Sequence, residues 1–437
     1  MFVAGLMFPG LFALVLAGIP IAFSLAIVSF AAGLVAFGPH IFNQLYGSLY
    51  SASTNFILSA IPMFILMGAI LERSGIAERL FKTMQLWMGR LPNGLAVATI
   101  AMGAVFAAAA GVVGAVEVMI GMMAIPAMQR YRYDNSLIAG TVCAGGSLGT
   151  MIPPSVIAVM YASLAQLSVG ELLAGMVFPG LIMIGLFIGY LIVRGVLSKP
   201  VDHGIVDEEQ ALPLAEKLKI TAGTLLPVIA LIVAVLGSLL AGIASPTEAA
   251  SVGAVGALIL CIAYGRFSFK VLRESLEITV RISAMILLIV AAGTMFMGVF
   301  AANGGGQLIR NFIESAGIGT VGMIVFFLVV VFVLGFVLDW TANVLICVPL
   351  FTPFVKAAGI DPVWFATMVI IVIQTGYLTP PMASSIFYLK SIAPPDMTYA
   401  QMCRGVVPFI ILQIITLALV ALFPETATWL PSKIVGF

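Results

Sequence analysis

The amino-acid sequence predicts an all-α, polytopic membrane protein built from two repeats, and two observations lead to this fold class. Of the 437 residues, 62% are hydrophobic and only 8% are charged, whereas soluble domains contain about 25% charged residues. A chain with so few polar residues must expose much of its surface to lipid. Several prolines and glycines also recur at one fixed spacing along the chain, which indicates an internal duplication.

Candidate membrane-spanning segments are apolar stretches of about 20 residues, the length that crosses a bilayer as a helix. They lie near 5–37, 56–72, 95–129, 171–196, 219–241, 246–264, 279–301, 320–357 and 399–424. Two of them, 95–129 and 320–357, are too long for one straight crossing, so we expect breaks at Gly111–Gly114 and Asp339–Thr341. Amphipathic stretches near 39–54, 73–92 and 265–278 are expected to form separate helices that lie along the membrane surface.

The duplication is clearest around two Pro-Pro pairs, Pro153-Pro154 and Pro380-Pro381. Superposing them also aligns, without gaps, Pro126 with Pro353, Asp134 with Asp361, Ala139 with Ala366, Gly149 with Gly376 and Tyr161 with Tyr388. Secondary transporters are often built from such repeats, inverted relative to each other in the membrane. We therefore expect a first repeat over 1–198, a polar connecting loop over 199–218 and a second repeat over 219–437.

Each Pro-Pro pair lies in a polar, glycine-rich segment between apolar arms that are too short to span the bilayer. These segments predict two re-entrant helical hairpins with unwound tips, at about 136–166 and about 361–393. Unwound backbone at membrane depth must be buried in protein or line a water-filled cavity. Gly149 and Gly376 are expected to adopt backbone conformations closed to other residues. The alternative, that Gly and Pro only kink packed helices, does not account for two tips at equivalent positions.

Hydroxyl groups are concentrated at the two tips, on Thr150, Ser155, Thr375 and Thr379. A sodium ion is a hard cation that binds hydroxyl and carbonyl oxygens, and interrupted helices commonly supply them in transporters. The chain has only two histidines, His40 and His203, and neither lies in an apolar span. Oxygen-rich tips and scarce titratable groups together favour sodium coupling over proton coupling.

Three acidic residues lie within or beside apolar stretches, where an unpaired charge costs at least about 2.5–3.5 kcal/mol. Asp339 occurs in the second break with Thr341 and Asn343, which favours a role near a transport site over plain helix capping. The run Ser245-Pro246-Thr247-Glu248 instead predicts a helix start capped by Ser and Glu. The sequence leaves the role of Glu117 open.

Several classes of function are disfavoured. A net charge of +1 provides no basic face to neutralise nucleic-acid phosphates. No Walker loop for nucleotide binding occurs. No nucleophilic side chain and base are predicted to lie at the same depth in the membrane, so we expect no catalytic activity. The cysteines occur singly, at positions 143, 261, 347 and 403, which favours neither a disulfide framework nor a transition-metal site.

With these features in hand, the sequence resembles the large membrane subunit of tripartite ATP-independent periplasmic (TRAP) transporters over essentially its whole length. Four runs carry the resemblance in the same order: Leu148–Ser155, Ser245–Ala250, Gly335–Asp339 and Leu378–Pro381. The resemblance implies an elevator-type sodium symporter of the bacterial inner membrane that takes up a small organic acid. It also implies two partners, a small four-helix membrane subunit (Q-type) and a periplasmic substrate-binding protein.

The residue predictions combine the motifs with this resemblance. The predicted substrate-binding residues are Ser155, Asp339, Thr341 and Asn343, and the predicted sodium-binding residues are Gly111, Gly146, Gly149, Thr150, Thr375, Gly376 and Thr379. The first break lacks the serines of sialic-acid-type relatives, which argues against a sialic-acid-like substrate. An oxo-acid, a hydroxy-acid, an aromatic acid and a C4-dicarboxylate stay open. A sodium/dicarboxylate symporter that works without a binding protein is the alternative function.

Overall fold

A computed structural model describes residues 2–89, 91–110, 113–197, 213–315, 317, 319–381 and 383–434, and its regular elements are all helical. The helices of the first repeat are α1 (Phe2–Leu16), α2 (Ile21–Phe37), η1 (Gly38–His40), α3 (Ile41–Ser53), η2 (Phe56–Ser59), α4 (Ala60–Arg73), α5 (Ile76–Met88), α6 (Gly94–Ala110), α7 (Val113–Arg130), α8 (Asn135–Ser147), η3 (Leu148–Thr150), α9 (Val156–Ala165) and α10 (Val169–Leu197). Those of the second repeat are α12 (Leu214–Leu240), α13 (Pro246–Ala263), α14 (Phe269–Ala302), α15 (Gly305–Ser315), α16 (Thr320–Leu334), α17 (Trp340–Ala357), α18 (Pro362–Leu378), α19 (Ser384–Lys390), α20 (Tyr399–Leu422) and α21 (Glu425–Ile434).

The duplication is visible in the helix bounds. Shifting α7 by 227 residues, the spacing of the two Pro-Pro pairs, reproduces both ends of α17. The same shift places α5, α6, α8, α9 and α10 on α15, α16, α18, α19 and α20, with ends that agree to within a few residues. Each repeat therefore contains a short amphipathic helix, two further helices in succession, a hairpin and a long helix, in that order. The second predicted break, at Asp339–Thr341, and both predicted hairpins are confirmed, whereas Gly111 and Val112 of the first predicted break lie outside the described residues.

Two predicted segments differ from the structure. The apolar stretch 5–37 is divided into α1 and α2, because Gly18 takes a positive φ of 86° and Pro20 follows shortly after it. The surface helix predicted over 265–278 is not separate, because α14 continues from this region without interruption. The corresponding part of the first repeat does break, between α3 and α4. The first repeat has helix-interrupting Asn55 and Pro62 there, whereas the second repeat has isoleucine at both equivalent positions.

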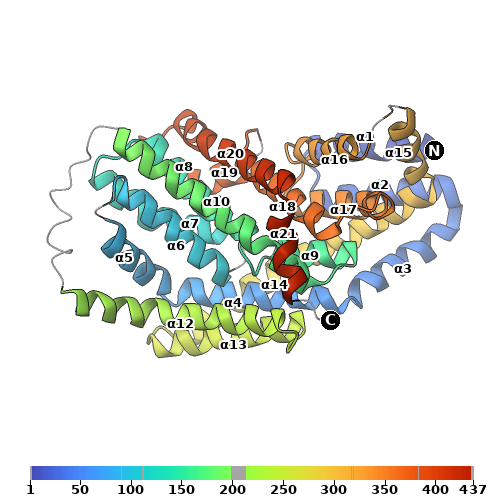
Figure 1. The fold of residues 1–437 in the computed structure, drawn as a ribbon. Helices are drawn as coiled ribbons and strands as arrows, with labels where there is room; N and C mark the ends of the chain where they lie inside the picture. Colours follow the sequence, from blue (N-terminus) through green and yellow to red (C-terminus); the bar gives the residue numbers. More distant parts are fainter. Residues whose placement is uncertain are drawn as a thin grey trace.

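The described helices are arranged as expected for a protein in lipid. Eight of them, counted over the described ranges, are long and apolar enough to cross a bilayer. In Figure 1, α12 and α13 lie along one edge of the molecule beside α4, and α13 packs against α4. Both α12 and α13 bury only one stripe and expose apolar side chains elsewhere. Such an apolar outer face is suited to contact with lipid or with another membrane subunit.

The hairpins occupy the interior. Helix α8 packs against α7, α6 and α20, and α18 packs against α20, α16 and α10. Every residue of α8 from Leu137 to Ser147 is buried, as is every residue of α18 from Phe365 to Leu378. This burial holds the two polar tips inside the protein, where unwound backbone is tolerated.

Candidate functional site

The first hairpin tip is closed by its own hydroxyl groups. The Ser155 hydroxyl donates to the Thr150 carbonyl at 2.7 Å, and the Thr150 hydroxyl donates to the Ser147 carbonyl at 2.9 Å. All three residues are buried. Ser155 precedes α9, but its side chain makes no capping hydrogen bond to that helix. The first amide groups of α9 therefore have no side-chain acceptor from Ser155.

The hydroxyl groups of the second hairpin tip also donate hydrogen bonds to backbone carbonyls of their own hairpin. The Thr375 hydroxyl donates to the Ile371 carbonyl at 2.8 Å, and the Thr379 hydroxyl donates to the Thr375 carbonyl at 2.7 Å. The Pro-Pro bond at each tip is cis. Since each of the four predicted tip hydroxyls gives its single hydrogen to a carbonyl, its oxygen keeps lone pairs that can face another ligand.

The two tips touch each other through residues at equivalent positions. The Gln374 side-chain amide donates to the Ser147 hydroxyl at 3.3 Å, and the two positions are 227 residues apart, which is the repeat spacing. Both residues are fully buried, and Gln374 Oε1 has no hydrogen-bond partner. Residues at equivalent positions of the two repeats are therefore in direct contact at the tips.

Asp339 caps the second half of the broken helix in the second repeat. Its carboxylate accepts hydrogen bonds from the backbone amides of Thr341 at 3.2 Å and Ala342 at 3.3 Å, which begin α17. Helix capping, which the sequence analysis placed second, is thus a structural role of Asp339. Glu248 was predicted to be part of a capping box with Ser245, and this is confirmed at the start of α13.

Asn343 connects the two halves of the same broken helix. Its side-chain amide donates to the Val331 carbonyl of α16 at 2.8 Å, and its carbonyl oxygen accepts from the Cys347 thiol at 3.2 Å. Asn343 is 1% exposed. The Val331 carbonyl also accepts from the Gly335 backbone amide at 3.1 Å, so Asn343 adds a second hydrogen bond to a carbonyl near the end of α16 and ties the two halves of the broken helix together.

A narrow cavity lies between this break and the second hairpin. Its lining comes from Gly335, Leu338, Asp339, Trp340 and Asn343 on one side and from Ile373, Gly376, Tyr377 and Ser384 on the other. The structure therefore brings together three predicted site residues, Asp339, Asn343 and Gly376. Ser155 and Thr150 belong to the first tip and do not line this cavity.

The glycines at the tips differ from the prediction in their backbone conformation. Gly149 and Gly376 do not have positive φ values, so the expectation of a backbone closed to other residues is wrong for both. Gly146 is required by close packing, because a Cβ there would lie 2.6 Å from Glu117 Cβ on α7. Gly111, a predicted sodium ligand, lies outside the described residues.

Glu117 is the one acidic residue buried completely in this region. One carboxyl oxygen, Oε1, makes a hydrogen bond with the Ser385 hydroxyl of α19, and the other, Oε2, has no hydrogen-bond partner among the residues that the structure describes. The sequence indicated Glu117 through its position in an apolar stretch. It contained no comparable signal for Ser385, whose partner is remote in the chain.

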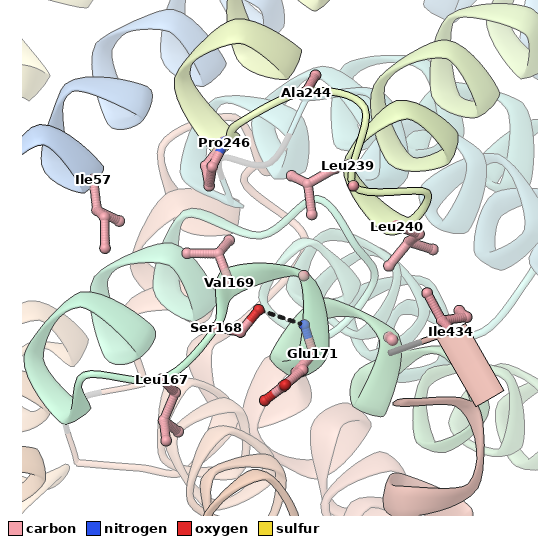
Figure 2. A pocket seen from close by; sticks show the side chains of 13 residues that line it. Ile57, Leu167, Ser168, Val169, Glu171, Leu239, Leu240, Ala244, Pro246 and Ile434 are labelled. Carbon is pink, nitrogen blue, oxygen red and sulfur yellow. Dashed lines mark hydrogen bonds between the residues drawn. The ribbon is translucent and has the colours of Figure 1, made fainter. Parts of the chain in front are cut away.

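A roomier pocket of about 330 Å³ lies elsewhere, between the start of α10, the end of α12, the start of α13 and Ile434. Figure 2 shows that its walls are mostly apolar and that the Ser168 hydroxyl accepts a hydrogen bond from the Glu171 amide, at 3.3 Å. This polar pair starts α10. None of the predicted site residues lines the pocket, so the cavity beside Asp339 is the better candidate site.

Comparisons with known proteins agree with the motifs. The family model described as the tripartite ATP-independent periplasmic transporter, DctM component, matches residues 8–426. The C4-dicarboxylate TRAP transporter large permease protein of Pseudomonas aeruginosa is 31% identical and covers 93% of each chain. The sialic acid TRAP transporter large permease protein of Vibrio cholerae is 29% identical and covers 98% of each chain.

A solved structure shares the fold. The Alcanivorax borkumensis YdaH transporter, described as having an unusual topology, superposes with a TM-score of 0.60 at 15% identity, over 90% of this chain and 89% of that chain. At this identity the likeness concerns the fold alone. With the family match extending over nearly all residues, the chain belongs to the DctM-component family of TRAP transporters and is a large permease subunit.

Proposed function

We propose that this chain uses a sodium gradient to carry a small organic acid across the bacterial inner membrane. In this proposal it works with a small membrane subunit and a periplasmic binding protein, as the family name implies. The observation that supports it best is the cavity in which the second break and the second hairpin meet around Asp339, Asn343 and Gly376. Interrupted helices that meet near the membrane midplane are where secondary transporters hold their substrates.

The substrate would lie in the cavity between the second break and the second hairpin and would extend from there towards the start of α9 in the first hairpin. Helix α9 packs against α17, so Ser155 at its start and Thr341 near the start of α17 come from neighbouring elements. The amide groups at the start of α9 have no side-chain cap and carry partial positive charge. A substrate carboxylate placed there would be received by these amides, with Asn343 and Asp339 setting the shape of the site.

Sodium ions would bind at the tips. The first site would use Gly146, Gly149 and Thr150, and the second would use Thr375, Gly376 and Thr379. The threonine hydroxyls already donate their hydrogens to carbonyls, so their oxygens would be presented to the cation as acceptors only. Unwound backbone at each tip would supply further carbonyl oxygens.

The conformational change would be of the elevator type. The two tips contact each other, and α8 packs against α7 and α20. These elements would move as one body. Helices α4, α12, α13 and α14, of which α12 and α13 expose an apolar outer face, would stay in place and meet the small membrane subunit. Glycine at positions 140 and 405 permits the closest crossing within the moving body, because a Cβ at either would lie 2.0 Å from a backbone oxygen of the other helix.

The proposal is tested by uptake of a radiolabelled C4-dicarboxylate into proteoliposomes that contain this chain, its small membrane subunit and its binding protein. We expect uptake only with both an inward sodium gradient and the binding protein. Sodium-driven uptake without the binding protein would support the alternative of a stand-alone dicarboxylate symporter. Uptake that is equal with sodium and potassium gradients would contradict sodium coupling.

Binding of sodium can also be measured without transport. A ligand that binds only the folded state at 100 times its Kd stabilises a protein by about 2.7 kcal/mol. We therefore expect sodium chloride, but not potassium chloride, to raise the melting temperature of the purified chain. Equal stabilisation by the two salts would argue against sodium sites at the tips.

A further inference from the structure

The cavity beside Asp339 is too small for an organic acid. Its volume is about 10 Å³, which is about the space that one water molecule needs. Pockets that hold small molecules usually measure about 300–1,000 Å³. An organic acid can therefore bind beside Asp339 only if at least one wall of the cavity moves.

Two walls of the cavity are closely held. At the second break, Asp339 accepts hydrogen bonds from the first amides of α17, and Asn343 donates to the Val331 carbonyl across the break. On α18, the residues of the wall lie in the stretch that is buried throughout. Tyr377, near the end of α18, belongs to this wall and is only 7% exposed.

Tyr388 of α19 packs on Tyr377. The two rings are stacked, with their centroids 6.5 Å apart and an angle of 24° between their planes. Tyr388 does not line the cavity itself, but its phenol is close enough to Asp339 for an electrostatic interaction. Tyr388 is 43% exposed. The pair therefore forms a wall that is two rings thick, with Tyr377 facing the cavity and Tyr388 on the exposed side.

The Tyr388 ring lies on a glycine of the first broken helix. A Cβ at Gly114 of α7 would lie 2.7 Å from Tyr388 Cζ and 3.0 Å from both Cε atoms of the ring. Carbon atoms in contact are normally about 3.5–4.0 Å apart, so any side chain at position 114 would push the ring away. Glycine at position 114 thus allows the ring to take its place over Tyr377.

The first repeat contains the equivalent tyrosine in a different setting. Tyr161 is the equivalent of Tyr388, but it is only 2% exposed, on an α9 helix that packs against α17. Residues Val156–Ser163 of α9 are all buried, whereas α19 buries only three of its seven residues. Of the two arm tyrosines, Tyr388 is therefore the one that can leave its place without disrupting a packed core.

We propose that Tyr388 is a positioning residue of the transport site, whose ring closes the cavity beside Asp339 and must leave Gly114 before an organic acid can enter. Departure of the ring vacates the space beside Tyr377, so that Tyr377 can move away from Asp339 and widen the cavity. The step requires rotation of the Tyr388 side chain and keeps the hydrogen bonds of the second break. This inference rests on the proposed function and deepens it, because it concerns how the same site admits its substrate.

Labelling of a cysteine in the cavity tests this role. Ser384 lines the cavity, and Ser384→Cys provides a thiol whose reaction with a small, water-soluble methanethiosulfonate is followed by mass spectrometry at position 384. If the open arrangement is a minor state of at most about 10%, removal of the ring in Tyr388→Ala should raise the labelling rate at least about tenfold. An unchanged rate would overturn the proposal.

Two further variants in the Ser384→Cys background separate closure by the ring from a general loosening of α19. Phe387→Ala is the matched control, because Phe387 is the adjacent ring of the same helix, is 54% exposed and does not line the cavity. We expect no acceleration in Phe387→Ala, and equal acceleration in Phe387→Ala and Tyr388→Ala would contradict a specific role of Tyr388. Tyr388→Phe keeps the ring and should label as slowly as the background, whereas rapid labelling would refute closure by the ring.

The last variant moves the ring without removing it. In Gly114→Ala the new methyl group would lie 2.7 Å from Tyr388 Cζ, so the ring must shift, and we expect faster labelling of Ser384→Cys. Addition of Tyr388→Ala to Gly114→Ala should restore no slow labelling and should give no more than the rate of Tyr388→Ala alone, because both changes act on one ring. No acceleration in Gly114→Ala, or additive acceleration in the combination, would overturn the proposal. These measurements use neither sodium nor substrate, so their failure is distinguishable from failure of the uptake assay.

Discussion

Substitution of Gly146 by alanine tests the close packing of the first hairpin against the first broken helix. A Cβ at Gly146 would lie 2.6 Å from Glu117 Cβ, 2.7 Å from its Cγ and 3.0 Å from its Cα. Carbon atoms in contact are normally about 3.5–4.0 Å apart. A change of side-chain rotamer moves Cγ but neither Cβ nor Cα, so α7 and α8 must separate.

The expected loss of stability in Gly146→Ala is the difference between two opposing effects. Overpacking a buried site costs typically about 1–3 kcal/mol, and alanine recovers at most about 1 kcal/mol through its higher helix propensity. The neighbouring Gly145 is a matched control in the same helix, because a Cβ there would meet its nearest atom, the Thr99 carbonyl oxygen, at 3.5 Å. Gly145→Ala should therefore be neutral or stabilising, and Gly146→Ala should be less stable than Gly145→Ala by about 1–3 kcal/mol.

The assay is thermal unfolding of both purified variants and the wild type in the same lipid or detergent, repeated with sodium and with potassium. Both substitutions keep the backbone carbonyl that could bind sodium, so a specific loss of the sodium effect in Gly146→Ala would reflect displacement of α8. If Gly146→Ala melts at or above the temperature of Gly145→Ala, the packing argument is refuted.

Three further substitutions separate transport from folding. Asp339→Asn should abolish uptake while the protein remains inserted and folded, because asparagine also caps helices; normal uptake would remove Asp339 from the site. Asn343→Ala removes one of the two hydrogen bonds to the buried Val331 carbonyl, which keeps the bond from the Gly335 amide, and should destabilise the chain by about 0.5–1.5 kcal/mol in thermal unfolding, whereas an unchanged melting temperature would argue against the bond across the break. Ser245→Ala removes a helix cap and should lower stability by about 1 kcal/mol without altering the sodium dependence of uptake, and an altered dependence would place this cap in the transport mechanism.

Much of the fold could be predicted from residues with unusual backbone preferences, which are proline, whose φ is fixed, and glycine, whose backbone is unusually free. Proline and glycine at matching positions located the repeat, both hairpins and the second break, because these residues disfavour a regular helix wherever they occur. The prediction was wrong where neighbouring elements decide the outcome. The segment 265–278 is amphipathic, but isoleucine at positions 282 and 289 lets the helix continue into the next span as α14.

The candidate site was harder to predict, because its contacts join distant parts of the chain. Ser385 in the second hairpin contacts Glu117 in the first repeat, a separation of 268 residues. A serine in an apolar arm is unremarkable until the fold shows its partner. Gly146 was chosen as a sodium ligand from its position near a tip, whereas the structure gives a packing reason for glycine there. A small residue at a helix crossing and one at an ion site have the same sequence signature.

The two repeats share a backbone frame but differ in chemistry. Asp339 and Asn343 at the second break have valines, Val112 and Val116, as their equivalents in the first repeat, and Glu117 has Val344 as its equivalent in the second. Each broken helix therefore has its own polar group. Because Glu117 contacts the second hairpin while the cavity beside Asp339 is lined by that same hairpin, the second hairpin lies between the two. A movement of the second hairpin that opens the cavity would also change its contact with Glu117, so this shared hairpin connects the two broken helices physically.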